Sequence, residues 1–336
     1  MANQTIARVA LVGLGPIGVE VARAVLGRPG IEVLGAADPA PDKAGRRLGE
    51  LLGGDGPFPI AASAQALYAE SAARRGKRDV VLLCTGSRLE SVAPQIEEAV
   101  EAGFHVVSTC EELSFPSLRH EHRAREIDAK AKEHGVAVLG TGVNPGLVMD
   151  RLALAAASAC VKIEKLKVTR VVDAAKRRGP LRAKVGAGLS KEDFEAGVGA
   201  RKLGHVGLSE SAAMIAVGLG LPIHEISETI EPVLAARETG GVAAGRVLGL
   251  HQIARVRAAG EIRVELDLTM AVGVEKAFDR IEIQGDPPVN LTVEGGFHGD
   301  RATVGCVVNA IPFVVQAPPG VQTVATLPLF GLLPQR

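Results

Sequence analysis

Two glutamates and a cysteine stand side by side in the segment 106–113, directly after an apolar run that is typical of a buried strand. A carboxylate there can move protons to and from an amine or a water molecule during imine chemistry, which predicts Glu111, or else Glu112, as a catalytic acid–base. Alternatively, Cys110 is the nucleophile of an acylating aldehyde dehydrogenase and forms a thioester. Two adjacent acids disfavour a thiolate, so the thiol is the weaker candidate. A structural role at the N-terminus of the next helix fits Glu112 better than Glu111.

A glycine-rich turn, G-L-G-P-I-G, begins at Gly13, between an apolar run and an amphipathic segment. In a dinucleotide-binding turn Gly13 permits the tight bend, Gly15 lets the backbone approach a pyrophosphate, and Gly18 lets helix and strand pack closely. Pro16 suits the first helical turn because its missing N–H is not needed there. Backbone N–H groups from Ile17 onward then face the phosphates. The turn predicts an NAD or NADP site.

Asp38 ends the next apolar run, about 20 residues after the turn, where an acid accepts hydrogen bonds from the adenosine ribose. Its charge opposes the 2′-phosphate of NADP, which favours NAD. Lys43, Arg46 and Arg47 follow shortly and could neutralise a phosphate, so NADP stays open.

Two further segments follow apolar runs at positions suited to the nicotinamide half of the cofactor. Cys84, Thr85 and Gly86 end the fourth run, and we expect hydroxyl and backbone contacts from them, although an ordinary turn explains Cys84 equally well. Asn144 and Pro145 lie in a glycine-rich loop after the sixth run. Asn144 can donate and accept and Pro145 stiffens the loop, so this pair is predicted to hold the carboxamide or the substrate.

The second half of the chain offers two candidate substrate contacts. Arg182 lies in a basic, glycine-punctuated stretch, 177–186, that would form a flap and bind an anionic group, although a solvated loop explains most of its charges. His205 precedes a helical segment and either lines the substrate pocket or caps the helix. No metal site is expected, since the four cysteines form no C-x-x-C pair and His120 and His122 are typical of a solvated helix.

The first half alternates short apolar runs with helical segments, which predicts a Rossmann-type, doubly wound parallel α/β domain over residues 1–150. Such a sheet binds ligands beyond the carboxyl ends of its strands, where the candidate residues lie. The expected strands are 7–12, 31–37, 58–61, 79–84, 104–108 and 136–139, and the expected helices are 17–26, 43–52, 64–73, 89–102 and 118–134.

Residues 151–300 have a different pattern of apolar runs, which is typical of consecutive strands with short Gly or Pro links. This pattern predicts an α+β domain on a mostly antiparallel sheet. Helix 302–315 and the C-terminal tail are expected to pack back on the first domain. The expected strands are 161–172, 226–235, 246–256, 262–270, 281–284 and 289–293, with helices at 191–198 and 208–219.

Composition narrows the function classes. The 336 residues carry 38 basic and 38 acidic side chains and only 3% aromatics, without Trp, which argues against nucleic-acid or anionic-lipid partners. No apolar run approaches the ~20 residues that span a bilayer. We therefore expect a cytoplasmic protein with a small-molecule substrate.

These motifs together resemble the 2,4-diaminopentanoate dehydrogenases and the related native amine dehydrogenases, whose N-terminal domain is similar to that of dihydrodipicolinate reductase. The resemblance implies NAD(P)-dependent oxidative deamination of an amine, reversible as reductive amination of a ketone or aldehyde with ammonia. It also implies a homodimer built through the second domain, and a catalytic glutamate within 108–113. The matching motifs are 13–18, 108–113, 140–146, 178–186, 204–211, 299–303 and 308–312.

Three alternatives remain. An imine or enamine reductase like dihydrodipicolinate reductase is one, although its His-His pair with a following lysine and its Gly-Thr-Ala turn are missing from this sequence. The acylating aldehyde dehydrogenase with Cys110 is the second. A cofactor-binding sensor without turnover is the third.

Overall fold

The computed structural model describes residues 6–54, 58–72, 79–176, 179–328 and 331. The chain divides into two units, one made of residues 1–147 and 299–336 and the other of residues 148–298. The second unit is therefore inserted into the chain of the first. No helix of the described part is long and apolar enough to cross a membrane.

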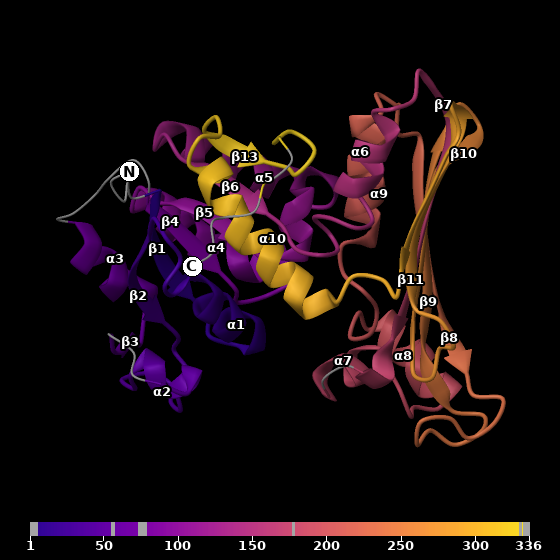
Figure 1. The fold of residues 1–336 in the computed structure, drawn as a ribbon, viewed down its shortest axis with the longest axis horizontal. Helices are drawn as coiled ribbons and strands as arrows, with labels where there is room; N and C mark the ends of the chain where they lie inside the picture. The colour runs from indigo at the N-terminus through magenta and orange to yellow at the C-terminus, as the bar shows by residue number, and fades with distance from the viewer. Residues whose placement is uncertain (1–5, 55–57, 73–78, 177–178, 329–330, 332–336) are drawn as a thin grey trace. The chain divides into compact units, whose positions relative to one another are not determined.

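The first unit is built on a seven-stranded parallel sheet with the order β13-β6-β5-β4-β1-β2-β3 (Figure 1). Every residue of β4 and β5 is buried, which explains the apolar runs Val80–Leu83 and Val106–Val107 within them. The strand order reverses between β1 and β4, the point at which such sheets bind ligands. The predicted doubly wound α/β fold is thus confirmed. The strands are β1 (Ala7–Val12), β2 (Ile31–Ala37), β3 (Ile60–Ala61), β4 (Asp79–Leu83), β5 (His105–Ser108), β6 (Ala137–Gly140) and β13 (Gly320–Gln322).

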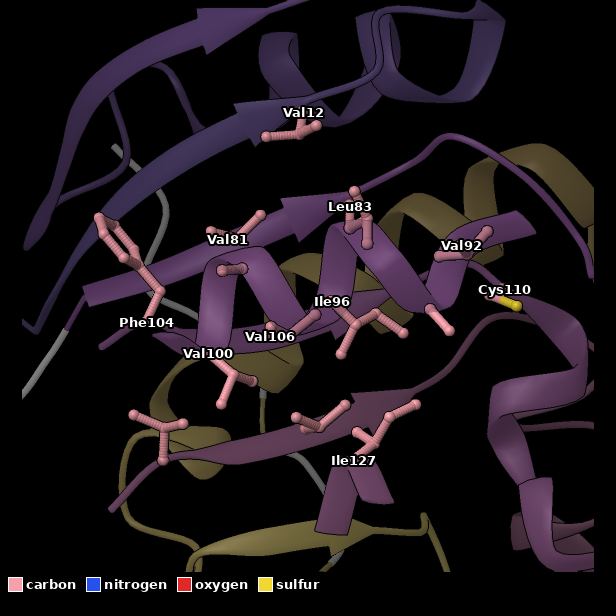
Figure 2. Close-up of a cluster of buried hydrophobic side chains, with 14 of the residues drawn as sticks. Val12, Val81, Leu83, Val92, Ile96, Val100, Phe104, Val106, Cys110 and Ile127 are labelled. Carbon is pink, nitrogen blue, oxygen red and sulfur yellow. The ribbon is translucent and has the colours of Figure 1, made fainter. Parts of the chain in front are cut away.

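Helices pack on this sheet through apolar stripes. In α4 the buried residues Val92, Ile96 and Val100 recur at helical spacing and meet the side chains of β4 and β5 in the core that Figure 2 shows. Helix α10 returns from the end of the chain to pack against α1 and β5. The helices of this unit are α1 (Pro16–Val25), α2 (Leu48–Leu52), α3 (Ala64–Ala72), α4 (Leu89–Glu101), α5 (Glu121–Glu133) and α10 (Gly299–Val314), with 3₁₀ turns η1 (Glu111–Ser114) and η2 (Pro116–Leu118).

Two expected elements of this unit are only about half as long as predicted. The helix expected at 43–52 begins only at Leu48, because the chain before it turns through Gly45, which has φ +81°, and hydrogen-bonds to Ile60 of β3. The strand expected at 58–61 pairs only over Ile60–Ala61. Strand β13 was not expected, and the last residue of the helix expected at 64–73 lies outside the described residues.

The second unit carries a six-stranded sheet with the order β12-β11-β7-β10-β9-β8, antiparallel except for the pair β7 and β10. Buried residues alternate along its central strands, because helices α6 and α9 cover only one face. The predicted mostly antiparallel α+β domain is confirmed. Its elements are α6 (Arg151–Ala157), β7 (Lys162–Asp173), η3 (Ala174–Lys176), α7 (Gly179–Lys184), α8 (Lys191–Gly199), α9 (Leu208–Gly218), β8 (Glu225–Leu234), β9 (Val247–Ala258), β10 (Glu261–Ala271), β11 (Phe278–Asp286) and β12 (Val289–Glu294).

A buried ion pair joins β7 to β11. Nη1 of Arg170 lies 3.0 Å and 3.1 Å from the two carboxylate oxygens of Asp279, and the two side chains are only 4% and 3% exposed. Phe297 completes the pair, since its N–H donates to Asp279 at 2.7 Å and its carbonyl accepts from Arg170 at 2.9 Å. Each charge is thus neutralised away from water.

We expect Asp279→Asn to lower the free energy of unfolding by about 3–5 kcal/mol, because it leaves the buried Arg170 charge uncompensated. Urea unfolding measures this change. The control is Glu294→Gln on β12, which removes an exposed pair with Lys276 and should cost less than about 1 kcal/mol. Equal costs for the two variants would contradict the argument.

Candidate active site

The carboxyl ends of four neighbouring strands lie along one edge of the parallel sheet. Backbone hydrogen bonds continue past the strand ends, from Cys84 N to Val12 O at 2.8 Å and from Thr109 N to Leu83 O at 3.1 Å. Thr141 N likewise donates to Ser108 O at 2.9 Å. The four segments that the sequence singled out, at 13–18, 84–86, 109–112 and 141–146, are therefore brought together.

The three glycines of the first segment have different surroundings. Gly13 has φ +85°, and a Cβ added there would lie 2.7 Å from the carbonyl oxygen of Cys84. A Cβ on Gly18 would lie 1.9 Å from the carbonyl oxygen of Gly13, so this glycine allows the helix to pack against the turn. A Cβ on Gly15 would meet nothing within 4 Å. Gly13 and Gly18 are thus required by the fold, whereas Gly15 leaves open space before the helix.

Helix α1 starts directly behind that space. Pro16 occupies its first turn, and Gly15 is its N-cap with extended backbone and no side-chain cap. The N–H groups of the first turn from Ile17 onward therefore point out of the helix end, where an anion is favoured.

Asp38 holds the glycine turn. Its carboxylate accepts from Leu14 N at 2.7 Å, from Ala40 N at 2.9 Å and from Lys43 Nζ at 3.0 Å, and the residue is 6% exposed. Burial alone would raise the pKa of Asp38, but these hydrogen bonds and the Lys43 charge hold that pKa below its ordinary value. Asp38 is therefore ionised at neutral pH and paired with a cation.

The segment after β4 lies against the glycine turn. The methyl group of Thr85 is 2.6 Å from the position of a Cβ on Gly13, and its hydroxyl donates to Gln95 at 2.7 Å. Desolvation raises the pKa of the Cys84 thiol to about 12, so this thiol is neutral. Gly86 lies next to α4, where a Cβ would come 3.2 Å from Val92.

The two adjacent glutamates at the tip of β5 have different environments. Glu112 is 4% exposed, and its carboxylate accepts from Arg88 Nη1 at 2.8 Å and from Leu89 N at 2.8 Å. Nε2 of His120 lies 3.0 Å from the same carboxylate. Glu111 is half-buried, and its backbone carbonyl accepts from Ser114.

Glu112 therefore binds the N-terminus of the preceding helix, α4, and not that of the next helix as the sequence indicated. His120, which the sequence placed on a solvated face, is a partner of this carboxylate with its side chain only 17% exposed. Burial would raise the pKa of Glu112, but the bonds from Arg88 and Leu89 lower it below its ordinary value.

Cys110 belongs to the apolar core (Figure 2). It is 1% exposed, and its Sγ donates to Ser87 O at 3.4 Å. Burial, together with the charges of Glu111 and Glu112, raises the pKa of this thiol to about 12. A buried neutral thiol is a poor nucleophile.

The loop after β6 is held by the helix that closes the unit. Thr303 of α10 accepts a hydrogen bond from Val143 N at 3.2 Å, which explains why the sequence motif at 299–303 accompanies the loop. Asn144 and Pro145 are buried and joined by a cis peptide bond. The buried hydroxyl of Thr141 has no hydrogen-bond partner among the described residues, and sequence reasoning overlooked it.

In the second unit, His205 lies near two cations. Burial, together with the charges of Lys184 and Arg170, lowers the pKa of His205 to about 3, so its imidazole is neutral. Its backbone is fixed by Gln252, which accepts from His205 N at 2.8 Å and donates to His205 O at 2.9 Å. Arg182 is half-buried on α7, and residues 177–178 of the expected flap lie outside the described residues.

The residues at the edge of the parallel sheet fit a dinucleotide. The space before Gly15 admits a pyrophosphate to the start of α1, and the ionised Asp38 lies at the end of β2, where a ribose is bound in such folds. Within the described part, no group of three or more His, Cys, Asp or Glu side chains is placed to hold a metal ion.

The model of the 2,4-diaminopentanoate dehydrogenase C-terminal domain matches residues 147–334, more than half of the chain. The 2,4-diaminopentanoate dehydrogenase of Acetoanaerobium sticklandii is 32% identical over 96% of this chain and 93% of its own length. This chain belongs to the 2,4-diaminopentanoate dehydrogenase family. The predicted resemblance is confirmed.

Two solved structures have folds similar to that of this family member. The amine dehydrogenase from Mycobacterium smegmatis superposes with a TM-score of 0.85 at 24% identity, over 100% of this chain and 99% of that one. Biliverdin reductase from Synechocystis, in complex with biliverdin and NADP+, superposes with a TM-score of 0.52 at 13% identity, over 86% and 80% of the chains. Structural neighbours thus bind NAD(P).

We expect two glycine substitutions in this family member to separate cofactor binding from folding. Gly15→Ala should fold like the parent and weaken NADH binding roughly tenfold, because its methyl group enters the space for the pyrophosphate. Gly18→Ala should lower the free energy of unfolding by about 1–3 kcal/mol, because its Cβ overlaps the carbonyl of Gly13.

NADH fluorescence titration and urea unfolding of both variants make this comparison. If Gly15→Ala binds NADH with the parent's affinity, the cofactor does not approach this turn.

Proposed function

We propose that this protein catalyses the NAD(P)-dependent oxidative deamination of an amine, reversible as the reductive amination of a ketone or aldehyde with ammonia, with Glu111 as the acid–base. Membership of the family establishes a dehydrogenase that acts on CH–NH2 donors. The observation that supports Glu111 is the contrast at the tip of β5. Glu112 is buried and engaged by three groups, whereas Glu111 is half-buried in the row of strand tips that carries the glycine turn.

The roles of the chain's own residues follow from that row. The glycine turn and Asp38 hold the adenosine half of the cofactor, while Thr85, Gly86 and Asn144 contact the other half. When bound, the nicotinamide supplies the hydride chemistry. Glu111 takes a proton from the water that attacks the substrate's iminium carbon. In the opposite direction it returns a proton to the leaving water.

Three alternatives have less support. The acylating aldehyde dehydrogenase needs a reactive thiolate, and Cys110 is a buried thiol whose pKa is raised to about 12. The imine reductase lacks its motif residues in this sequence. The sensor without turnover leaves the half-buried Glu111 without a role.

We expect Glu111→Gln to reduce ammonia-dependent NADH oxidation with a carbonyl panel at least about 100-fold, because the amide cannot take up the proton. NADH binding should persist. Cys110→Ala is the matched control in the same segment, and it should retain most of the turnover because its thiol does no chemistry.

Activity that survives in Glu111→Gln would contradict the assignment. A requirement for coenzyme A, together with loss of activity in Cys110→Ala, would identify the acylating enzyme instead.

NAD is the proposed cofactor. The ionised Asp38 opposes a 2′-phosphate, and Lys43, the nearest cation that sequence reasoning raised in favour of NADP, is paired with that carboxylate at 3.0 Å. Arg46 is paired with Glu50 at 3.0 Å. The cations that could favour NADP are thus partly neutralised by the chain itself.

We expect the native protein to have a higher kcat/KM with NADH than with NADPH. Asp38→Asn should move the ratio of the two values about tenfold towards NADPH, because it removes a like charge beside the phosphate. The ratio is insensitive to a partial loss of folded protein. An unchanged ratio would exclude Asp38 as the discriminating residue.

The substrate contacts and the assembly remain predictions. Asn144, Pro145, Arg182 and His205 are the proposed substrate residues, and the neutral His205 would offer hydrogen bonds without charge. If the amine also carries a carboxylate, Arg182 or Lys184 should matter for turnover. The homodimer implied by the family resemblance would use the second unit, in whose described residues the helices lie on one face of the sheet (Figure 1).

A further inference from the structure

A cluster of contacts joins the loop after β4 to the loop after β5. We call it the inter-loop cluster, and it comprises Ser87, Arg88, Leu89 and Glu112. The carbonyl of Ser87 accepts from Glu112 N at 3.3 Å. In the other direction, the Glu112 carboxylate accepts from Arg88 Nη1 and from Leu89 N, both at 2.8 Å.

The Glu112 carboxylate is the centre of this cluster. It occupies the N-terminus of α4, where its charge is stabilised by the helix dipole as well as by Arg88. A third partner, His120, precedes α5, so that the same carboxylate also reaches the segment between η2 and α5. Two oxygens thus bind three groups from two parts of the chain, and the side chain is only 5% exposed.

The two loops that the inter-loop cluster joins carry different parts of the proposed site. Thr85 and Gly86, on the first, are the proposed contacts of the nicotinamide half of the cofactor. Glu111, on the second, is the proposed acid–base. No covalent constraint sets the distance between them, because the loops are about 25 residues apart in sequence. The hydrogen bonds of the inter-loop cluster instead link the two loops, close to Thr85, Gly86 and Glu111.

We propose that Glu112 is a positioning residue, which holds Glu111 at a fixed place relative to the bound cofactor. This inference rests on the proposed function, because it presumes that Glu111 moves the proton. Glu112 itself touches no reacting atom. Its effect on the reaction passes through the backbone of the peptide unit that it shares with Glu111, and displacement of a catalytic group by about 1 Å can cost 100-fold in rate.

The position requires a carboxylate of this length. Asp at position 112 would be one methylene short of the N-terminus of α4, whereas Gln would keep an acceptor for Leu89 N–H but lose the charge that pairs with Arg88. We therefore expect a graded series in which Glu112→Gln retains more turnover than Glu112→Asp or Glu112→Ala.

The experiment measures kcat for ammonia-dependent NADH oxidation per NADH-binding site, the KM for the carbonyl substrate, and the Kd for NADH. Glu112→Ala should lower kcat per site about 10–100-fold while the Kd for NADH stays within about twofold. Glu112→Gln should fall between Glu112→Ala and the parent. The matched control is Glu90→Gln, an 83% exposed side chain on the first turn of α4 that lies 3.8 Å from His120, and it should leave all three constants unchanged.

A kcat per site at the parent's value in Glu112→Ala would overturn the proposal. So would a loss of activity that merely follows the number of NADH-binding sites, because it would assign Glu112 to folding alone. If Glu112→Ala does not fold, Arg88→Gln decides, since it removes one donor from a side chain that is 45% exposed. It should lower kcat per site with unchanged Kd for NADH, and an unchanged kcat overturns the proposal.

Glu111→Gln separates this inference from the proposed function. Loss of turnover in Glu111→Gln with normal kcat in the Glu112 variants refutes the positioning role and leaves the proposed function standing. Full turnover in Glu111→Gln, with loss in Glu112→Gln, refutes both, because Glu112 would then itself be the acid–base.

Discussion

The parallel hydrogen-bond ladder of the first sheet is the constraint on which the rest of this molecule depends. Because parallel strands all end at the same edge, segments from different parts of the chain become neighbours. Bonds such as Cys84 N to Val12 O and Thr141 N to Ser108 O extend that alignment past the last paired residue of each strand. Every candidate residue of the first unit lies on, or next to, a segment fixed in this way.

Similar residues along this edge differ because their surroundings differ. The two glutamates after β5 are adjacent in sequence, yet one carboxylate is engaged by Arg88, Leu89 and His120 while the other stands on a half-buried residue. The glycines differ in the same way, since a Cβ on Gly18 would lie 1.9 Å from the carbonyl oxygen of Gly13, whereas a Cβ on Gly15 would meet nothing within 4 Å. The fold thus requires Gly18, while Gly15 is the proposed contact of the cofactor.

Two buried polar side chains of the second unit also avoid an isolated charge. Arg170 is buried, but Asp279 neutralises it, and the imidazole of His205 is kept neutral by burial and by two nearby cations. In both cases the buried polar group is either paired or uncharged, which avoids the cost of an isolated buried charge.

The sequence by itself determined the two domains' fold classes, most strands and helices, the cofactor turn and the family, because these are set by local patterns of buried strands, turn glycines and motif residues. It predicted Glu111 as the acid–base, with Glu112 as the alternative, but not how the surroundings of the two side chains differ. Only the tertiary structure showed that Glu112 is paired with Arg88, since these residues lie 24 positions apart and meet through neighbouring strands. The same holds for His120, which a helical charge pattern placed in solvent. Contacts of this kind depend on which elements become neighbours, and no local pattern of residues records that.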